Sequence, residues 1–292
     1  MNTFGIFMNF WESDWNADHA KYIRKAAGLG YDILEFQAQP LLEFPDHHLK
    51  DLKKLADDCG IELTYSLGLD LQYDVSSTDE NVRRRGVEYL KRIMARVALM
   101  DGRIISGVSY AGWGAPQQYM DDKVPLLENS KKSMYSLMQT AGDYGITYCV
   151  EAVNRFEGCL LNTAEEAVAY VKDIGSQQIG VLLDTYHMNI EECSIPEAIR
   201  CAAPVLKGFH TGENNRTPPG CGYGHLDWDA IFGALREVGY TGRIVSEPFV
   251  KSGGTVGFAV KTWRDLVPDT SEAALDALAA QLLAFEKQKL AG

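Results

Sequence analysis

The chain has 292 residues, of which 46% are hydrophobic and 23% charged, the ordinary composition of a globular protein. Its formal net charge is −12, and its densest basic cluster, residues 83–85, lies in a stretch of helical period, so a solvated helix face is expected there. The apolar N-terminus lacks the basic leader of a signal peptide, and no run approaches the roughly 20 apolar residues of a membrane span. These features count against nucleic-acid and membrane partners.

Short β-rich runs alternate with longer stretches of helical period along the whole chain. Several of these runs are almost continuously apolar, as expected for strands that are buried on both faces. The predicted strands span residues 4–10, 31–36, 61–66, 103–108, 146–153, 179–184, 205–210 and 243–247.

The stretches between the strands carry helix signals. Apolar residues recur with helical spacing at Val87, Leu90, Met94 and Val97, and again at Leu275, Leu278, Leu282 and Phe285. Ser77-x-x-Glu80 and Thr163-x-x-Glu166 predict capping boxes that open helices. Helix C-termini with a left-handed residue are predicted at four glycines: Gly30, Gly60, Gly145 and Gly239.

Eight strand–helix alternations without a linker predict one parallel sheet covered by helices. A single (β/α)8 TIM barrel spanning residues 1–292 is the first choice, and an open doubly wound sheet is the second. No GxGxxG follows the first strand, which counts against a dinucleotide-binding sheet.

The six cysteines suggest a reduced, cytoplasmic protein. None of them forms a C-x-x-C pair, so neither a zinc ribbon nor a thioredoxin-like site is predicted. Cys149 lies in an apolar run and is expected in the core.

Four chemically active side chains end four consecutive predicted strands. In a parallel barrel the carboxyl ends of the strands meet at one mouth, where barrel enzymes build their sites. A lone Asp at such a position is more often a helix cap, but three carboxylates and an imidazole in register need a cation to offset their repulsion. Oxygen-rich ligation with one imidazole suits Mn²⁺, Mg²⁺ or Co²⁺, and Zn²⁺ remains open. The four residues are Glu151, Asp184, His210 and Glu247.

The motifs around these residues resemble the ketose 3-epimerases, the D-tagatose and D-psicose (D-allulose) 3-epimerase family. The matching segments are 151–158 (EAVNRFEG), 183–192 (LDTYHMNIEE), 209–216 (FHTGENNR) and 247–257 (EPFVKSGGTVG), and the resemblance extends through nearly the whole chain. It implies a (β/α)8 barrel with one catalytic metal ion, usually Mn²⁺ or Co²⁺, held by the same four residues. It also implies a free ketose as substrate and a homodimer or homotetramer.

The resemblance further implies a set of residues that hold the sugar. Polar contacts to the substrate would come from Glu157, His187 and Arg216, and an apolar pocket from Phe7, Trp15, Trp113 and Phe249. The chain departs from the commonest family pattern at Ser66, where Gly is frequent, and along residues 36–40. Both segments border the pocket mouth, so the preferred ketose stays open.

A mechanism follows as a hypothesis. Epimerisation at C3 needs one group to remove the proton and another to return a proton on the opposite face. Glu151 and Glu247 are the expected pair, and the metal would stabilise the cis-enediolate that forms on deprotonation. Three alternatives remain: an aldose–ketose isomerase on the same barrel, a metal-dependent apurinic endonuclease and a non-catalytic sugar-binding protein.

Overall fold

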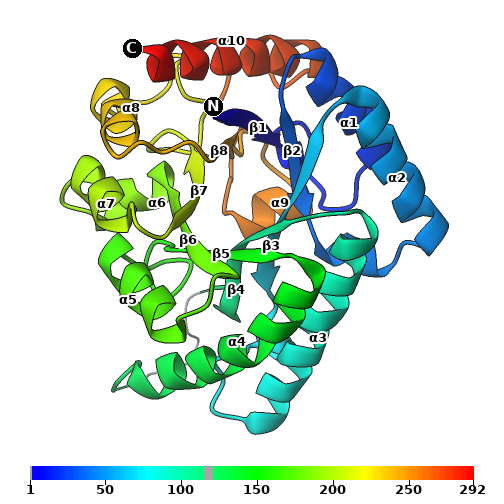
Figure 1. The fold of residues 1–292 in the computed structure, drawn as a ribbon. Coiled ribbons are helices and arrows are strands. Elements are labelled where there is room, and N and C mark those ends of the chain that lie inside the picture. Colours follow the sequence, from blue (N-terminus) through cyan, green and yellow to red (C-terminus); the bar gives the residue numbers. More distant parts are fainter. Residues whose placement is uncertain (1, 115–120) are drawn as a thin grey trace.

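Eight parallel strands close into a barrel in which each strand pairs with the next along the chain and β8 pairs with β1 (Figure 1). The computed structural model describes residues 2–114 and 121–292. This closed arrangement confirms the predicted (β/α)8 barrel and rules out the open sheet. The strands are β1 Thr3–Phe7, β2 Ile33–Gln37, β3 Glu62–Leu69, β4 Ile104–Gly112, β5 Thr147–Glu151, β6 Ile179–Asp184, β7 Leu206–Thr211 and β8 Arg243–Ser246.

The helices surround the barrel, and the C-terminal helix α10 lies beside α8 (Figure 1). They are α1 His19–Gly28, α2 Asp46–Cys59, α3 Glu80–Leu99, α4 Val124–Tyr144, α5 Ala164–Ile174, α6 Thr185–Glu191, α7 Ile195–Ala202, α8 Trp228–Glu237, α9 Gly254–Ala259 and α10 Glu272–Ala291. In the described part of the chain, three short 3-10 helices follow strands: η1 Met8–Phe10, η2 Gln39–Leu42 and η3 Leu71–Tyr73. Within the described ranges, no helix is both long enough and apolar enough to cross a membrane.

The sequence patterns correspond to these elements for physical reasons. Every residue of β6 is buried, because helices cover its outer face and barrel side chains its inner face. The predicted stripe on α3 faces the core, with Leu90, Met94 and Val97 buried. Thr163 and Glu166 form the predicted capping box of α5. All four glycines predicted to end helices adopt positive φ values.

Several local predictions are wrong. The strands predicted at 61–66 and 103–108 continue to Leu69 and Gly112, and the strand predicted at 146–153 ends at Glu151. The first strand ends at Phe7 rather than at residue 10, because the chain turns into η1 with its three residues buried. The predicted box of Ser77 and Glu80 does not open α3; Asp79 is the N-cap and accepts the Asn81 amide. Ser77, Thr78 and Asp79 all have N-capping chemistry, so the sequence pattern alone does not distinguish them.

Helix α10 places a buried carboxylate, that of Glu286, against the carboxyl-terminal ends of β7 and β8. Glu286 is fully buried and accepts hydrogen bonds from the hydroxyls of Thr211 and Ser246, which adjoin His210 and Glu247 in the chain. Its second oxygen has no hydrogen-bond partner among the described residues. Burial raises the pKa of Glu286 to about 7, although the two hydroxyls favour its ionised form.

Stability should therefore depend on pH through Glu286. The unfolded chain loses this proton near pH 4.5 but the folded chain holds it to about pH 7, so the folded state binds more protons over that window and is destabilised as the pH rises. Between pH 5 and pH 8, the free energy of unfolding of the wild type should fall by up to about 3 kcal/mol more than that of Glu286→Gln. This difference corresponds to about 5 °C in Tm. Thermal unfolding of both proteins at pH 5 and pH 8 measures this difference. If the Tm of wild type and of Glu286→Gln changed equally between the two pH values, the prediction would be contradicted.

Candidate active site and metal centre

The four residues at the strand ends come together at the carboxyl-terminal mouth of the barrel. Glu151 and Asp184 are the last residues of β5 and β6, His210 lies in β7, and Glu247 follows β8 directly. Each offers one ligand atom, and these atoms all lie within 4.8 Å of one another. All four residues are buried.

The donor set fits a divalent cation. The Glu151 Oε1 and His210 Nδ1 atoms are buried and have no hydrogen-bond partner among the described residues. Unpaired buried polar atoms are costly, so two of them in one cluster indicate a missing partner. Three carboxylate oxygens and one imidazole nitrogen are ligands that Mn²⁺, Co²⁺ and Mg²⁺ accept.

The carboxylates also resist ionisation without such a partner. Burial raises the pKa of Glu247 to about 7. Burial, followed by the charges of Glu247 and Asp184, raises the pKa of Glu151 well above its usual value. Asp184 differs: burial opposes its ionisation, but Arg216 and other neighbours hold its pKa below the usual value. A bound cation would favour the charged form of all three.

Asp184 caps a helix and also lies in the four-residue cluster, so the two alternatives do not exclude each other. It is the N-cap of α6, where its Oδ1 accepts the Tyr186 amide at 2.7 Å. Its Oδ2 atom lies 3.3 Å from an Arg216 nitrogen. The cap fixes the side-chain rotamer, so the carboxylate that contributes to the cluster is held rigidly.

A residue not anticipated from the sequence orients His210. Glu35 of β2 lies 3.0 Å from the His210 Nε2 atom, and Thr64 donates a hydrogen bond to its other oxygen at 2.8 Å. Glu35 is 1% exposed. Burial opposes protonation of His210, but the charge and hydrogen bond of Glu35 raise the pKa of His210 to about 10. With Nε2 turned to Glu35, the Nδ1 atom is left free for the cluster.

Glu35→Gln should weaken metal binding about 10- to 100-fold, because the uncharged amide makes His210 a less basic ligand. Metal titration measures the change. Glu62→Gln is the matched control, since Glu62 pairs with Arg243 near the opposite ends of the strands and does not contact the cluster. Equal affinity of wild type and Glu35→Gln would remove Glu35 from the metal site.

Arg216 connects the metal cluster to the expected substrate contacts. Its Nη1 atom donates to Glu247 at 2.9 Å, and its guanidinium lies over the Tyr186 ring at 4.0 Å from the centroid. Its Nη2 atom lies 3.7 Å from Glu157. The backbone of Arg216 has a φ of 65°, uncommon for a residue with a side chain. The Phe249 amide donates to its carbonyl oxygen at 3.0 Å and helps to hold this conformation.

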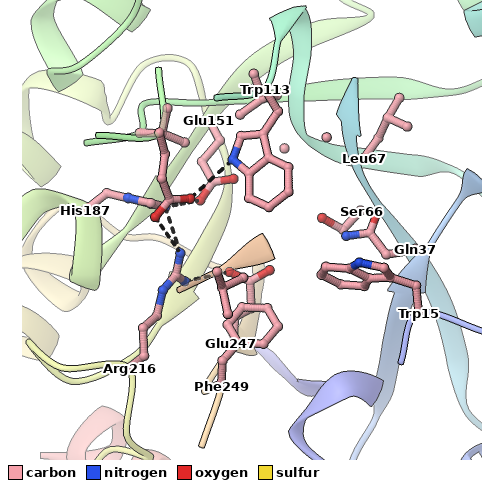
Figure 2. Close-up of a pocket in the computed structure, with 16 residues that line it drawn as sticks. Trp15, Gln37, Ser66, Leu67, Trp113, Glu151, His187, Arg216, Glu247 and Phe249 are labelled. Carbon is pink, nitrogen blue, oxygen red and sulfur yellow. Dashed lines mark hydrogen bonds and ion pairs between the residues drawn. The ribbon is translucent and has the colours of Figure 1, made fainter. Parts of the chain in front are cut away.

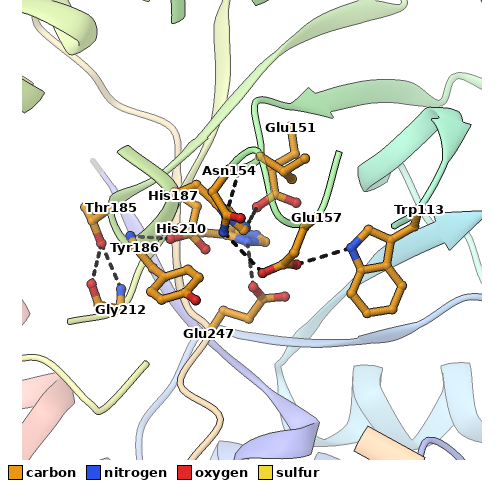
Figure 3. Close-up of polar contacts among 12 residues, drawn as sticks. Trp113, Glu151, Asn154, Glu157, Thr185, Tyr186, His187, His210, Gly212 and Glu247 are labelled. Carbon is orange, nitrogen blue, oxygen red and sulfur yellow. Dashed lines mark hydrogen bonds and ion pairs between the residues drawn. The ribbon is translucent and has the colours of Figure 1, made fainter. Parts of the chain in front are cut away.

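His187 and Glu157 join the same network (Figure 3). The backbone amide of Asn154 donates to the His187 Nδ1 atom at 3.1 Å, and the His187 Nε2 atom lies 3.1 Å from Arg216 Nη2 and 3.4 Å from Glu151 Oε1. Burial lowers the pKa of His187 to about 4, which keeps the ring neutral near pH 7. Glu157 accepts hydrogen bonds from Asn154 and from the Trp113 indole, both at 3.2 Å.

Three of the four predicted pocket aromatics line the cavity above the cluster. Trp15, Trp113 and Phe249 all do so (Figure 2). Phe7 does not line it, because it is fully buried and packs edge-to-face against Phe249, with ring centroids 5.6 Å apart. Phe7 therefore supports the wall from behind Phe249, and its contact with the sugar stays an expectation.

Sequence reasoning missed three residues of this site: Glu35, Asn154 and Tyr186. A signal was present only for Glu35, the single charge inside the buried run Ile33-Leu34-Glu35-Phe36, because a carboxylate in such a strand needs a partner. Asn154 and Tyr186 carry no comparable signal, since their contacts with His187 and Arg216 depend on how the loops fold.

Comparison with known proteins gives a consistent family. The xylose isomerase-like TIM barrel family matches residues 23–280. A D-psicose 3-epimerase of Agrobacterium fabrum is 42% identical over 288 residues, covering 99% of each chain. An L-ribulose 3-epimerase of Mesorhizobium japonicum is 34% identical over 275 residues, covering 92% of this chain and 89% of the relative.

A solved structure agrees with the sequence matches. The crystal structure of a D-psicose 3-epimerase in the presence of D-fructose aligns with a TM-score of 0.96 and 41% identity, covering 99% of this chain and 100% of the other. The strand-end cluster, the cavity above it and these similarities lead to one assignment: the chain belongs to the ketose 3-epimerases of the xylose isomerase-like TIM barrel family.

Proposed function

We propose that the chain epimerises free ketoses at C3, with one divalent cation held by Glu151, Asp184, His210 and Glu247. The observation that carries the proposal is the cluster of four ligand atoms within 4.8 Å, beneath a cavity that is lined by Trp15 and Trp113. Relatives named as D-psicose and L-ribulose 3-epimerases support a ketose as the substrate. Mn²⁺ or Co²⁺ is the proposed ion, and Mg²⁺ would also fit the donor set.

Glu151 and Glu247 are the proposed acid–base pair. They enter the cavity from opposite sides (Figures 2 and 3), as transfer to two faces of one carbon requires. The carboxylate on one face takes the C3 proton, and the carboxyl group on the other returns a proton there. When bound, the cation supplies electrostatic stabilisation for the substrate oxygens that become negative during this exchange.

The surrounding residues would fix the sugar in register. Arg216 would donate N–H groups to the O1–O2 end of the ketose, and His187 would hydrogen-bond the same end; the burial of both side chains keeps them preorganised. Glu157 would accept a sugar hydroxyl, while Trp15, Trp113 and Phe249 exclude water and pack against carbon faces. An aldose–ketose isomerase is not favoured, because no observation in this site selects it over the epimerase.

The proposal is tested by label position and by metal dependence. Chelator-treated protein should be inactive, and Mn²⁺ or Co²⁺ should restore activity on D-psicose, D-tagatose or L-ribulose. Turnover in D₂O should place deuterium at C3 of the recovered ketose. Label at C1 would indicate an isomerase instead, and full activity after metal removal would contradict the metal site.

We also propose a cytoplasmic location and a homodimeric or homotetrameric assembly. All six cysteines are free thiols, which supports a reducing compartment. The resemblance to ketose 3-epimerases supports the assembly. Native mass spectrometry tests the oligomeric state, and cell fractionation tests the location.

A further inference from the structure

A large outer chamber adjoins the catalytic cavity and has no role in the chemistry described so far. Its volume is about 410 Å³. It shares four lining residues with the catalytic cavity: Trp15, Gln37, Gly68 and Trp113. Small-molecule sites measure about 300–1,000 Å³, so the chamber alone has the size of a complete binding site.

The chamber lies at the end of the cavity away from the donors for O1 and O2. In Figure 2, Arg216 and His187 lie on one side of the catalytic carboxylates, and Gln37 and Trp15 lie on the other. A ketose held at O1 and O2 by Arg216 and His187 therefore points its C6 end towards the chamber. A free hexose has only three carbons beyond the reacting C3, which would leave most of the chamber unfilled.

The walls of the chamber have the chemistry that binds a neutral sugar ring. Tyr73 and Tyr89 stack with their ring centroids 3.9 Å apart and their planes 7° from parallel. Trp15 and Trp113 add two further aromatic side chains. Aromatic side chains suit the C–H faces of a pyranose, while amide, carboxylate and guanidinium groups hydrogen-bond its hydroxyls.

Two amide side chains in the chamber wall have oxygens that no group in the described part of the chain uses as acceptors. Gln39 donates from Nε2 to the Gly68 carbonyl at 2.7 Å, which fixes its orientation. The Oε1 atoms of Gln37 and Gln39 are buried and have no partner among the described residues. Both side chains line the chamber, where amide groups hydrogen-bond the hydroxyls of a sugar.

The charges in the chamber favour a neutral group over a phosphate. Arg92 is the only cationic side chain that lines it in the described part of the chain, and the Glu43 carboxylate lines it too. A phosphate would meet that carboxylate and a chain of net charge −12.

We propose that this outer chamber is a glycosyl subsite, and that the chain epimerises ketohexoses with a sugar attached at O6 as well as free ketoses. The inference rests on the proposed function, because the same Glu151 and Glu247 exchange the C3 proton in both substrates. The added sugar changes no bond in the reaction. O6 is the linkage because it is the ketose oxygen farthest from the reacting carbon.

The test compares D-fructose with 6-O-α-D-glucopyranosyl-D-fructose, whose fructose unit keeps a free anomeric carbon and can open to the ketone. Mn²⁺-loaded wild type should place deuterium from D₂O at C3 of both sugars and form the glucosyl-psicose product, measured by NMR and chromatography. Tyr89→Ala removes one stacking ring and should lower kcat/KM for the disaccharide about tenfold. Its activity on D-fructose should stay within about twofold, because Tyr89 does not line the catalytic cavity.

Two further variants keep the result interpretable. Leu42→Trp fills the chamber and should block the disaccharide while sparing D-fructose. Tyr135→Ala removes a tyrosine that is 69% exposed on α4 and should change neither activity. Turnover of D-fructose without the disaccharide would overturn the subsite, and turnover of neither would overturn the proposed function. Equal losses on both sugars in Tyr89→Ala, or a preference for D-fructose 6-phosphate that Arg92→Gln abolishes, would also contradict a glycosyl subsite.

Discussion

Replacing either Glu151 or Glu247 by Gln should abolish epimerisation, lowering kcat about a thousandfold or more. Glutamine keeps the volume and one ligating oxygen but cannot exchange a proton at C3. Both side chains lie in the buried cluster beneath the cavity, so the loss should occur without unfolding. Steady-state kinetics with saturating Mn²⁺, together with circular dichroism, measures the two effects separately.

The two variants should differ in the proton exchange that survives. Because each glutamate serves one face of the ketose, any residual incorporation of deuterium should be confined to one epimer, and to opposite epimers in the two variants. The control is again Glu62→Gln, whose carboxylate pairs with Arg243 away from the cluster. Retention of near-normal kcat by either variant would remove that glutamate from the acid–base pair.

Arg216→Met should destabilise the metal-free protein by about 3–5 kcal/mol, because it leaves buried carboxylates without their cationic partner. Arg216 lies 2.9 Å from Glu247 and 3.3 Å from Asp184, and it is 6% exposed. A loss of this size corresponds to about 5–10 °C in Tm for a chain of this length. Activity should also fall sharply, since the O1–O2 end of the ketose loses a donor.

Metal should restore much of this stability, because a divalent cation neutralises the same carboxylates. Thermal unfolding of Arg216→Met with and without Mn²⁺ measures the recovery. Arg200→Met is the control: Arg200 pairs with Glu197 and Glu237, whose side chains are 73% and 58% exposed, so its Tm should barely change. The same Tm loss with and without Mn²⁺ would mean that Arg216 stabilises the site by packing on Tyr186 rather than by its charge.

Glu35→Gln changes the residue that contacts His210 on the side away from the cluster, and it complements the experiments on the two glutamates and on Arg216. It changes neither a proposed proton carrier nor a substrate contact, so its effect should appear in metal affinity and be relieved at high metal concentration. The loss in Glu151→Gln should persist at any metal concentration. This difference separates a residue that positions a ligand from one that carries a proton.

The sequence by itself determined the barrel and the four residues at its mouth. Alternating apolar runs and helical stripes define the βα units, and strand direction sends all carboxyl ends of a parallel barrel to one rim. Glu151, Asp184, His210 and Glu247 could therefore be brought together from strand-end positions alone. Local signals also predicted the capping box at Thr163, whose two partners are three residues apart.

Only the tertiary structure decided contacts between segments that are distant in the chain. Glu35 meets His210 across the barrel, 175 residues away in sequence (210 − 35), and no local pattern encodes that approach. Phe7 faces the core because Phe249 covers it, and the outer chamber exists because η2, η3 and α3 converge beside the cavity. Periodicity reports which face of an element is buried, but the partner on that face depends on how the elements pack.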